Sequence, residues 1–144
     1  NELTTIPKAI LQHKQLESLY ISSCGIRRIP AALKKLTNLK RLSICNNELK
    51  NSNIEKTIGE LPALEELTIG NRHQELILKG RFPSLKQLSL FEAVWLHANS
   101  FDQRELDVLD IKNSVPEPAS HAVIICKKIK MTIPNPMILI LMII

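Results

Sequence analysis

Leucine and isoleucine recur along the chain at positions one, four and six of a short segment, with polar residues between them. The pattern L-x-x-L-x-L begins at Leu16, Leu39, Leu64, Leu85 and Leu106, so the starts are 23, 25, 21 and 21 residues apart. Positions four and six are two residues apart, so their side chains fall on the same face of a β-strand. One such segment cannot bury its apolar face alone. The pattern therefore predicts a stack of similar coils, each of which contributes one strand to a common sheet.

The most complete segment is Leu39 to Leu49, which reads L-x-x-L-x-L-x-x-N-x-L. The amide of Asn47 can donate and accept hydrogen bonds, so we expect it to bond backbone groups of its own turn and of the next coil. Arg72 stands at the corresponding position, counted from Leu64, and a buried unpaired arginine is costly. We therefore expect a rearranged turn after Ile69, with Arg72 exposed to solvent. The corresponding positions in the other coils are Asn1, Cys24, Ala93 and Ser114.

The segments that return from one strand to the next differ along the chain. Pro7 and Pro30 stand where the first two returns begin, and a fixed φ suits that position. Ile54, Ile58 and Leu61 have helical spacing and predict a short α-helix over residues 53–61. Residues 75–79 are predicted to be extended, and residues 93–100 to form a turn of helix that carries Trp95.

This organisation resembles the leucine-rich repeat family over residues 1–114. The L-x-x-[IL]-P-x-x-[IL] tail of the first two units is similar to the 23-residue class of intracellular signalling scaffolds, plant immune receptors and bacterial effectors. The resemblance implies an α/β fold: a curved solenoid with a parallel β-sheet on its concave face and short helices or extended segments on its convex face. Asn1-Glu2-Leu3 matches the N-x-L end of a repeat strand. We therefore interpret residues 1–114 as about five to six repeats, cut at the N-terminus of the domain.

Residues 115–144 are predicted to be a C-terminal cap or a hydrophobic tail. Ser114 to Pro118 has the composition of a linker. Val123 to Cys126 is apolar and β-branched, so we expect it to pair with the last coil as a cap, with Lys127 and Lys128 turned outward. Residues 137–144 are all apolar, but they are too few to span a bilayer, which needs about 20 residues. Three alternatives stay open for them: a cap strand or helix, a truncated membrane segment, or a disordered or unnatural end.

Composition and charge narrow the class of partner. The hydrophobic content of 44% and the charged content of 23% are those of a globular chain. The net charge of +5 raises the expectation of an acidic partner, but no nucleic-acid-binding signature accompanies it. We expect no nucleic acid as partner, and membrane contact only through residues 137–144. The chain has three cysteines, a sparse and odd set that favours a reducing compartment. The predicted location is the cytoplasm, or a host cytoplasm if the protein is an effector.

The sequence contains no pattern typical of catalysis or of a cofactor site. His13, His73, His97 and His121 share no metal-ligand spacing, and no glycine-rich phosphate loop occurs. We therefore expect no enzymatic activity, no metal and no cofactor. Some bacterial effectors of the family that this chain resembles carry a cysteine-dependent ubiquitin ligase domain after their repeats. Cys126 is the only cysteine past the repeats, and its apolar surroundings favour a packed side chain. Cys24 and Cys45 are not expected to form a disulfide, because their Cβ vectors diverge.

Function is predicted to lie on the outward positions of the strands, which line the concave face. We hypothesise a non-enzymatic protein–protein interaction module, as part of a bacterial effector or an immune receptor. Tyrosine and arginine are enriched in binding hot spots, and an exposed phenylalanine on a strand favours a partner. The nine candidate residues are Tyr20, Arg41, Ser43, Glu66, Thr68, Gln87, Ser89, Phe91 and Asp110. The wider outward set adds Ser18, Ser22, Ser23, Cys45, Asn46, Gly70, Asn71, Glu92, Val108, Lys112 and Asn113.

Three other interpretations stay open. The outward residues can be ordinary solvated strand positions. The repeats can be the recognition region of a larger enzyme, such as a ubiquitin ligase effector, whose catalytic domain is absent from this chain. The apolar end can belong to a membrane-anchored receptor ectodomain, although no cysteine-rich capping accompanies it. The partner and the oligomeric state are left undetermined by the sequence.

Overall fold

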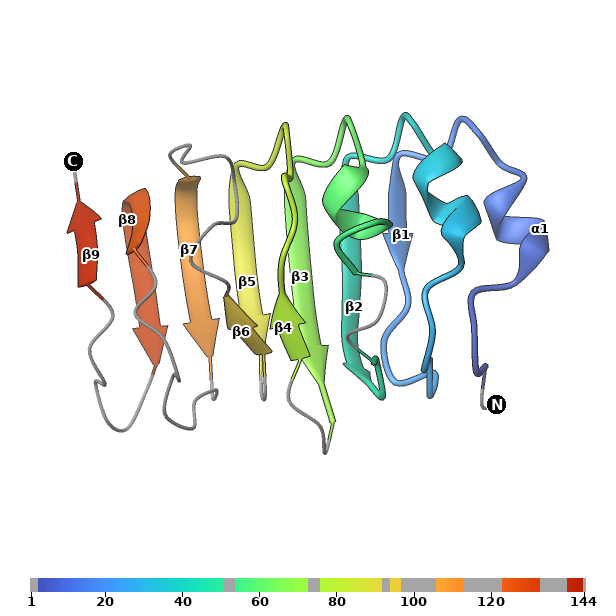
Figure 1. Ribbon diagram of the computed structural model, residues 1–144, viewed down its shortest axis with the longest axis horizontal. Coiled ribbons are helices and arrows are strands. Elements are labelled where there is room, and N and C mark those ends of the chain that lie inside the picture. Colours follow the sequence, from blue (N-terminus) through green and yellow to red (C-terminus); the bar gives the residue numbers. More distant parts are fainter. Residues whose placement is uncertain are drawn as a thin grey trace.

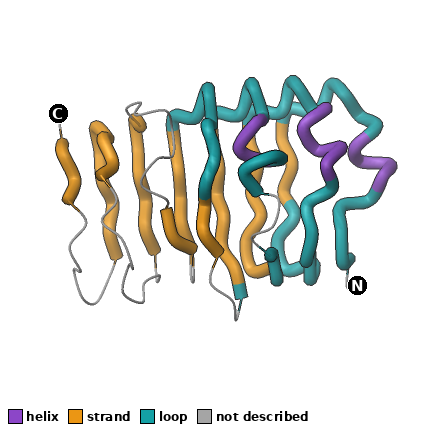
Figure 2. The backbone as a smooth tube through the Cα atoms, viewed as in Figure 1, coloured by secondary structure: helices purple, strands orange, loops and turns teal. Residues whose placement is uncertain are grey.

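A computed structural model of the 144-residue chain shows a solenoid with a broad sheet on one side and short return elements on the other (Figures 1 and 2). The structure describes residues 3–50, 54–72, 76–91, 94–96, 106–112, 123–132 and 140–143. The predicted architecture, one strand per coil, is confirmed over these residues.

The broad sheet has seven strands in the order β1-β2-β3-β5-β7-β8-β9. All six neighbouring pairs are parallel, as a coil with one strand in each turn requires. The second leucine of each repeat forms one row, so Leu42 lies opposite both Leu19 and Leu67. The strands are β1 (Ser18–Tyr20), β2 (Arg41–Asn47), β3 (Glu66–Asn71), β5 (Gln87–Phe91), β7 (Leu106–Lys112), β8 (Val123–Thr132) and β9 (Ile140–Ile143).

The first return segments are helical, and prolines introduce two of them. Pro7 and Pro30 immediately precede α1 (Lys8–Leu11) and η1 (Ala31–Lys35), with φ of −58° and −64°. The predicted α-helix at residues 53–61 is wrong where the structure describes it, because within residues 54–61 the helical element is the short 3₁₀ helix η3 (Ile58–Glu60). The helical spacing did identify the buried side chains, since Ile54, Ile58 and Leu61 are all at most 1% exposed.

The later return segments are strands. β4 (Leu76–Leu78) agrees with the extended segment predicted at residues 75–79. The helical turn predicted at residues 93–100 is wrong where the structure describes it, because β6 (Val94–Leu96) is a strand. β6 pairs in parallel with β4, so that Ile77 lies opposite Trp95. Pairing with β4 in the preceding coil therefore determines that residues 94–96 are extended, and the periodicity of the segment itself does not show this.

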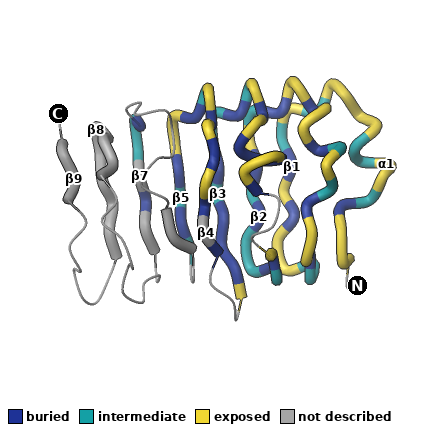
Figure 3. Tube along the Cα trace, viewed as in Figure 1, coloured by how far each residue is buried: buried dark blue, intermediate teal, exposed yellow. Residues whose placement is uncertain are grey.

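The hydrophobic core lies between the sheet and the return segments (Figure 3). Leu39, Leu42 and Leu64 are each at most 2% exposed, as the repeat pattern predicts. Gly59 of η3 and Gly80 after β4 approach closely: a Cβ added to Gly80 would lie 2.6 Å from the Cα of Gly59. Glycine at both positions therefore lets two return segments pack backbone to backbone.

The parallel sheet continues past Lys112. β8 pairs with β7 in a register that sets Cys126, Ile129 and Met131 opposite Leu106, Leu109 and Ile111. These residues keep the spacing of the repeat with cysteine and methionine in place of leucine. The linker expected at residues 114–118 and the side chains of Lys127 and Lys128 lie outside what is described, so the boundary at residue 114 stays a prediction. Among the described residues, no helix is long and apolar enough to cross a membrane.

Candidate functional site

The open face is the side of the broad sheet that points away from the return segments, and its middle row crosses five strands. Register places Tyr20, Ser43, Thr68, Ser89 and Asp110 side by side. Tyr20 is 69% exposed, whereas the three small hydroxyl residues are half-buried. Asp110 is only 9% exposed, so the alternative that the outward residues are ordinary solvated positions does not hold for it. Its strand lies between β5 and β8, inside the sheet.

A second row of the open face lies one step towards the strand N-termini and contains Ser18, Arg41, Glu66, Gln87 and Val108. Arg41 Nη1 donates to Ser18 Oγ at 3.2 Å. Its Nε lies 3.8 Å from Glu66 Oε2. Contacts on both sides thus hold the exposed guanidinium across three strands, which reduces the entropy that a partner's contact with it would cost.

A third row lies towards the strand C-termini, where Phe91 is opposite Gly70. Phe91 was expected to be exposed, but it is half-buried, and Gly70 is buried. A Cβ added to Gly70 would lie 2.7 Å from Phe91 Cβ. The missing side chain of Gly70 therefore makes room for the aromatic residue beside it, and packing within the sheet accounts for part of the surface of Phe91.

Charges alternate from coil to coil at the N-terminal ends of the strands. The second residue of successive coils is Glu17, Lys40, Glu65, Lys86 and Asp107. Lys40 Nζ lies 3.3 Å from Glu17 Oε1, and Lys86 Nζ lies 3.3 Å from Glu65 Oε1. We call this row the charge ladder. Each exposed pair contributes little by itself, about 0–1 kcal/mol, but the alternation avoids like charges in neighbouring coils.

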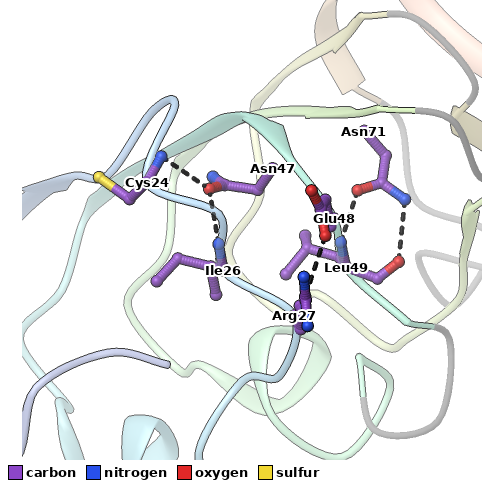
Figure 4. A network of polar contacts seen from close by, with 7 residues as sticks. All are labelled: Cys24, Ile26, Arg27, Asn47, Glu48, Leu49 and Asn71. Carbon is purple, nitrogen blue, oxygen red and sulfur yellow. Dashed lines mark hydrogen bonds and ion pairs between the residues drawn. The ribbon is translucent and has the colours of Figure 1, made fainter. Parts of the chain in front are cut away.

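A buried asparagine closes the turn after β2. Asn47 Oδ1 accepts hydrogen bonds from the N–H groups of Cys24 at 3.1 Å and Ile26 at 3.0 Å (Figure 4). Its Nδ2 donates to the carbonyls of Ile21 at 2.8 Å and Cys45 at 3.1 Å. The bond to Cys45 confirms the expected contact with its own turn, but the other three run to the preceding coil, so the expectation that they reach the next coil is wrong. One side chain thus satisfies four backbone groups of two stacked turns.

The corresponding role in the following coil belongs to Asn71, which the outward set wrongly placed on the open face. Asn71 is 1% exposed; its Oδ1 accepts from Leu49 N–H at 2.6 Å and its Nδ2 donates to Leu49 O at 2.9 Å (Figure 4). Ile44 pairs with Ile69, but Asn47 pairs with Asn71, because this turn is one residue shorter. The rearrangement predicted after Ile69 is confirmed, and Arg72 is exposed.

The extra residue of the longer turns has positive φ. Ser23 and Asn46 both have φ of 56°, a conformation that serine and asparagine adopt at modest cost. They are joined by Asn46 Nδ2 donating to Ser23 Oγ at 2.7 Å. Counting residues from Leu64 therefore points to Arg72, whereas the adjacent asparagine is the residue that can make the bonds.

Comparison with known proteins bears on this geometry. The family described as "FBD-associated F-box protein At5g56370, LRR repeats" matches residues 1–132. The chain belongs to this family of leucine-rich repeats. No curated protein and no solved structure matches it. A leucine-rich repeat solenoid is typically an interaction scaffold without catalytic activity.

Cys24 and Cys45 of these leucine-rich repeats form no disulfide. Cys24 packs partly against the core and its backbone N–H is held by Asn47. Cys45 is half-buried on the open face. In the part of the chain that the structure describes, no three His, Cys, Asp or Glu residues come together as a metal would need.

Proposed function

We propose that the open face of the leucine-rich repeats binds a partner protein. The observation that supports this most directly is the middle row, in which five strands align their outward residues in one register. Ser43, Thr68 and Ser89 have small hydroxyl side chains and are half-buried, whereas Tyr20 in the same row is exposed. Such a surface offers hydrogen-bonding groups without bulky side chains that a partner would have to displace.

Tyr20 and Arg41 are the proposed anchors. Tyr20 is one of the two large hydrophobic residues exposed in the described part of the chain, and tyrosine brings a large contact area with a polar tip. Arg41 is held in place by Ser18 and Glu66. Phe91 is a weaker candidate than its sequence position suggests, because it packs beside Gly70. Glu66 and Gln87 complete the proposed surface, and Asp110 is a weaker candidate because it is only 9% exposed.

The test is comparative affinity capture from an extract of the source cells. Wild-type protein, Tyr20→Ala/Arg41→Ala and the control Lys8→Ala/Lys35→Ala are used as bait, and the control changes exposed residues of the return side. A partner of the open face is captured by wild type and control, and is lost from the anchor variant. Equal capture of a purified, confirmed partner by all three baits would contradict the proposal.

A second candidate function has its own support. The matching family is described from an F-box protein that carries leucine-rich repeats. This favours the alternative in which the present repeats are the recognition region of a larger protein, including a larger enzyme. The flanking coding sequence distinguishes the two. A catalytic or adaptor domain on the same polypeptide supports the second candidate, and a reading frame with only repeats contradicts it.

The cytoplasm is the proposed location. The sparse, odd set of three cysteines supports it, since disulfide frameworks are typical of secreted rather than cytosolic domains. Roles in a bacterial effector or an immune receptor are finer proposals of the same kind, and identification of the captured partner would test them.

A further inference from the structure

Basic residues gather on one rim of the solenoid, away from the open face. We define the basic rim as Arg27, Arg28, Lys50 and Arg72, which lie on the turns just after the strands. All four side chains are exposed. In the described segments 24–28, 47–50 and 71–72, Glu48 is the only acidic residue. The rim therefore carries an excess of positive charge in a short stretch of three coils.

The backbone stacks these residues closely. Lys50 N–H donates to Arg27 O at 3.2 Å, and Arg27 N–H donates to Thr4 O at 3.0 Å. Arg28 follows Arg27 directly and bridges to Thr5 of the coil before. Arg27 and Lys50 thus occupy consecutive rungs, with the same sign of charge in neighbouring coils.

Glu48 and Asn46 orient part of this cluster. Arg27 Nε lies 2.9 Å from Glu48 Oε2, and both side chains are about half exposed, at 56% and 42% (Figure 4). Arg72 N–H donates to Asn47 O at 2.7 Å, and its Nε donates to Asn46 Oδ1. Two guanidinium groups are thereby anchored through one nitrogen, and their terminal nitrogens have further donors to offer.

The rim differs from the charge ladder in the same coils. The ladder alternates Glu17, Lys40 and Glu65, so that each charge is next to an opposite one. Like charges in adjacent strands are destabilising, so folding alone favours the alternating arrangement. Exposed residues whose mutual repulsion opposes folding are candidates for binding, where a partner supplies the opposite charge.

We infer that the basic rim binds an acidic segment of a partner protein. Guanidinium groups match the geometry of carboxylates and bond them bidentately. The stacked coils repeat about every 4.8 Å, so an acidic chain laid across the turns meets successive cations. The basic rim shares no residue with the anchors of the open face. Loss of binding at one of the two surfaces therefore does not imply loss of binding at the other.

The experiment uses the full chain and a fluorescent peptide of ten alternating Glu and Asp residues. Arg28→Glu/Lys50→Glu is compared with the control Lys8→Glu/Lys35→Glu, which changes the net charge equally on exposed residues elsewhere. The rim variant is expected to bind the peptide at least about tenfold more weakly, and the control to change about twofold or less. Binding by wild type is expected to weaken steeply with salt. Equal losses in the two variants would overturn the proposal, because net charge alone would then explain binding.

A gain-of-affinity variant guards against loss through misfolding. Glu48→Gln removes the carboxylate that competes for Arg27, so peptide affinity is expected to rise about threefold. No gain, together with an unchanged melting temperature, would overturn the inference. Duplex DNA of equal charge and anionic phosphatidylserine vesicles are the competing probes. Tighter binding of either one, lost in the rim variant alone, would overturn the assignment to an acidic protein segment.

Discussion

The coils that begin at Leu16 and Leu39 return through 3₁₀ helices, whereas those that begin at Leu64 and Leu85 return through strands. The former occupy 23 and 25 residues and the latter 21 each. A strand advances about 3.3 Å per residue and a 3₁₀ helix about 2.0 Å. An extended return therefore covers the same distance with fewer residues. We call these the long coils and the short coils.

The long coils and the short coils share the register of the sheet but differ in the turn and in the return segment. Both kinds of coil hold the same sheet register, in which Leu42, Leu67 and Leu88 form one row. The turn after the strand loses a residue at Asn71, and the return changes from helix to strand. The register of the sheet thus constrains the repeat, and the return segment adapts to the number of residues available.

The largest expected effect comes from removing the amide that closes the long-coil turn. Asn47→Ala leaves two N–H groups and two carbonyls without this partner, and buried unsatisfied groups cost about 1–3 kcal/mol each before relaxation. We expect a loss of about 3–5 kcal/mol in the free energy of unfolding, measured in urea. Asn46→Gly is the control, since glycine accepts positive φ, and should change it by under about 1 kcal/mol. A loss under about 1 kcal/mol for Asn47→Ala would show that the turn is held otherwise.

The joint between the two kinds of coil is expected to be the next most sensitive point. Gly80→Ala places a methyl group 2.6 Å from Gly59 Cα and 2.9 Å from Phe82 Cε2. We expect about 1–3 kcal/mol of destabilisation from this overpacking, measured by thermal unfolding. Ala31→Ser on the exposed surface of η1 is the control and should stay within about 0.5 kcal/mol. If Gly80→Ala unfolds like wild type, the close backbone approach is not required for the change of return.

The sheet and most of the open face could be predicted because both depend on local spacing. Leu42 and Ile44 are two positions apart, and that spacing alone places Arg41 and Ser43 on the other face. The middle row follows once all coils are aligned on their leucines. The correct strand neighbours of Tyr20, Thr68 and Ser89 therefore follow from this spacing without any information on packing.

The sequence-based predictions are wrong where a strand from another coil, or a change in the length of a turn, determines the local structure. Residues 94–96 form a strand because β4 lies alongside, and only the 21-residue interval hints at this from sequence. Asn71 was not recognised as the counterpart of Asn47. The same number of residues, counted from the first leucine of the repeat, leads to Arg72, because the turn before it is one residue shorter. The basic rim was missed because Arg27 and Lys50 are separated in sequence and meet only through stacking of the coils.

A smaller effect is expected on the open face of the short coils. Gly70→Ala would place its methyl carbon 2.7 Å from Phe91 Cβ and 3.0 Å from Phe91 O. The backbone positions both atoms, so only a small backbone shift can relieve this contact, and we expect about 1–2 kcal/mol of destabilisation in urea. In a double-mutant cycle with Phe91→Gly, which removes the Cβ of residue 91, the two changes should couple by about 0.5–1 kcal/mol, because they share one contact. Strict additivity would show that Gly70 is not there to accommodate Phe91.

The smallest expected effect concerns the charge ladder, which runs through long and short coils alike. Lys40 lies between Glu17 and Glu65 in the stack; its Nζ is 3.3 Å from Glu17 Oε1, and its carbonyl accepts the N–H of Glu65 at 2.8 Å. Lys40→Glu therefore sets three acidic residues in consecutive coils, and should cost about 0.5–1 kcal/mol at low salt. Lys40→Ala removes the pair without adding repulsion and should cost less, about 0.3 kcal/mol. Urea unfolding at several salt concentrations separates the two causes. At 1 M salt the Debye length is only about 3 Å, so the difference between the two variants should nearly vanish if charge alternation is its source. A difference that persists in 1 M salt would instead point to altered packing of the Lys40 stem at the edge of the sheet.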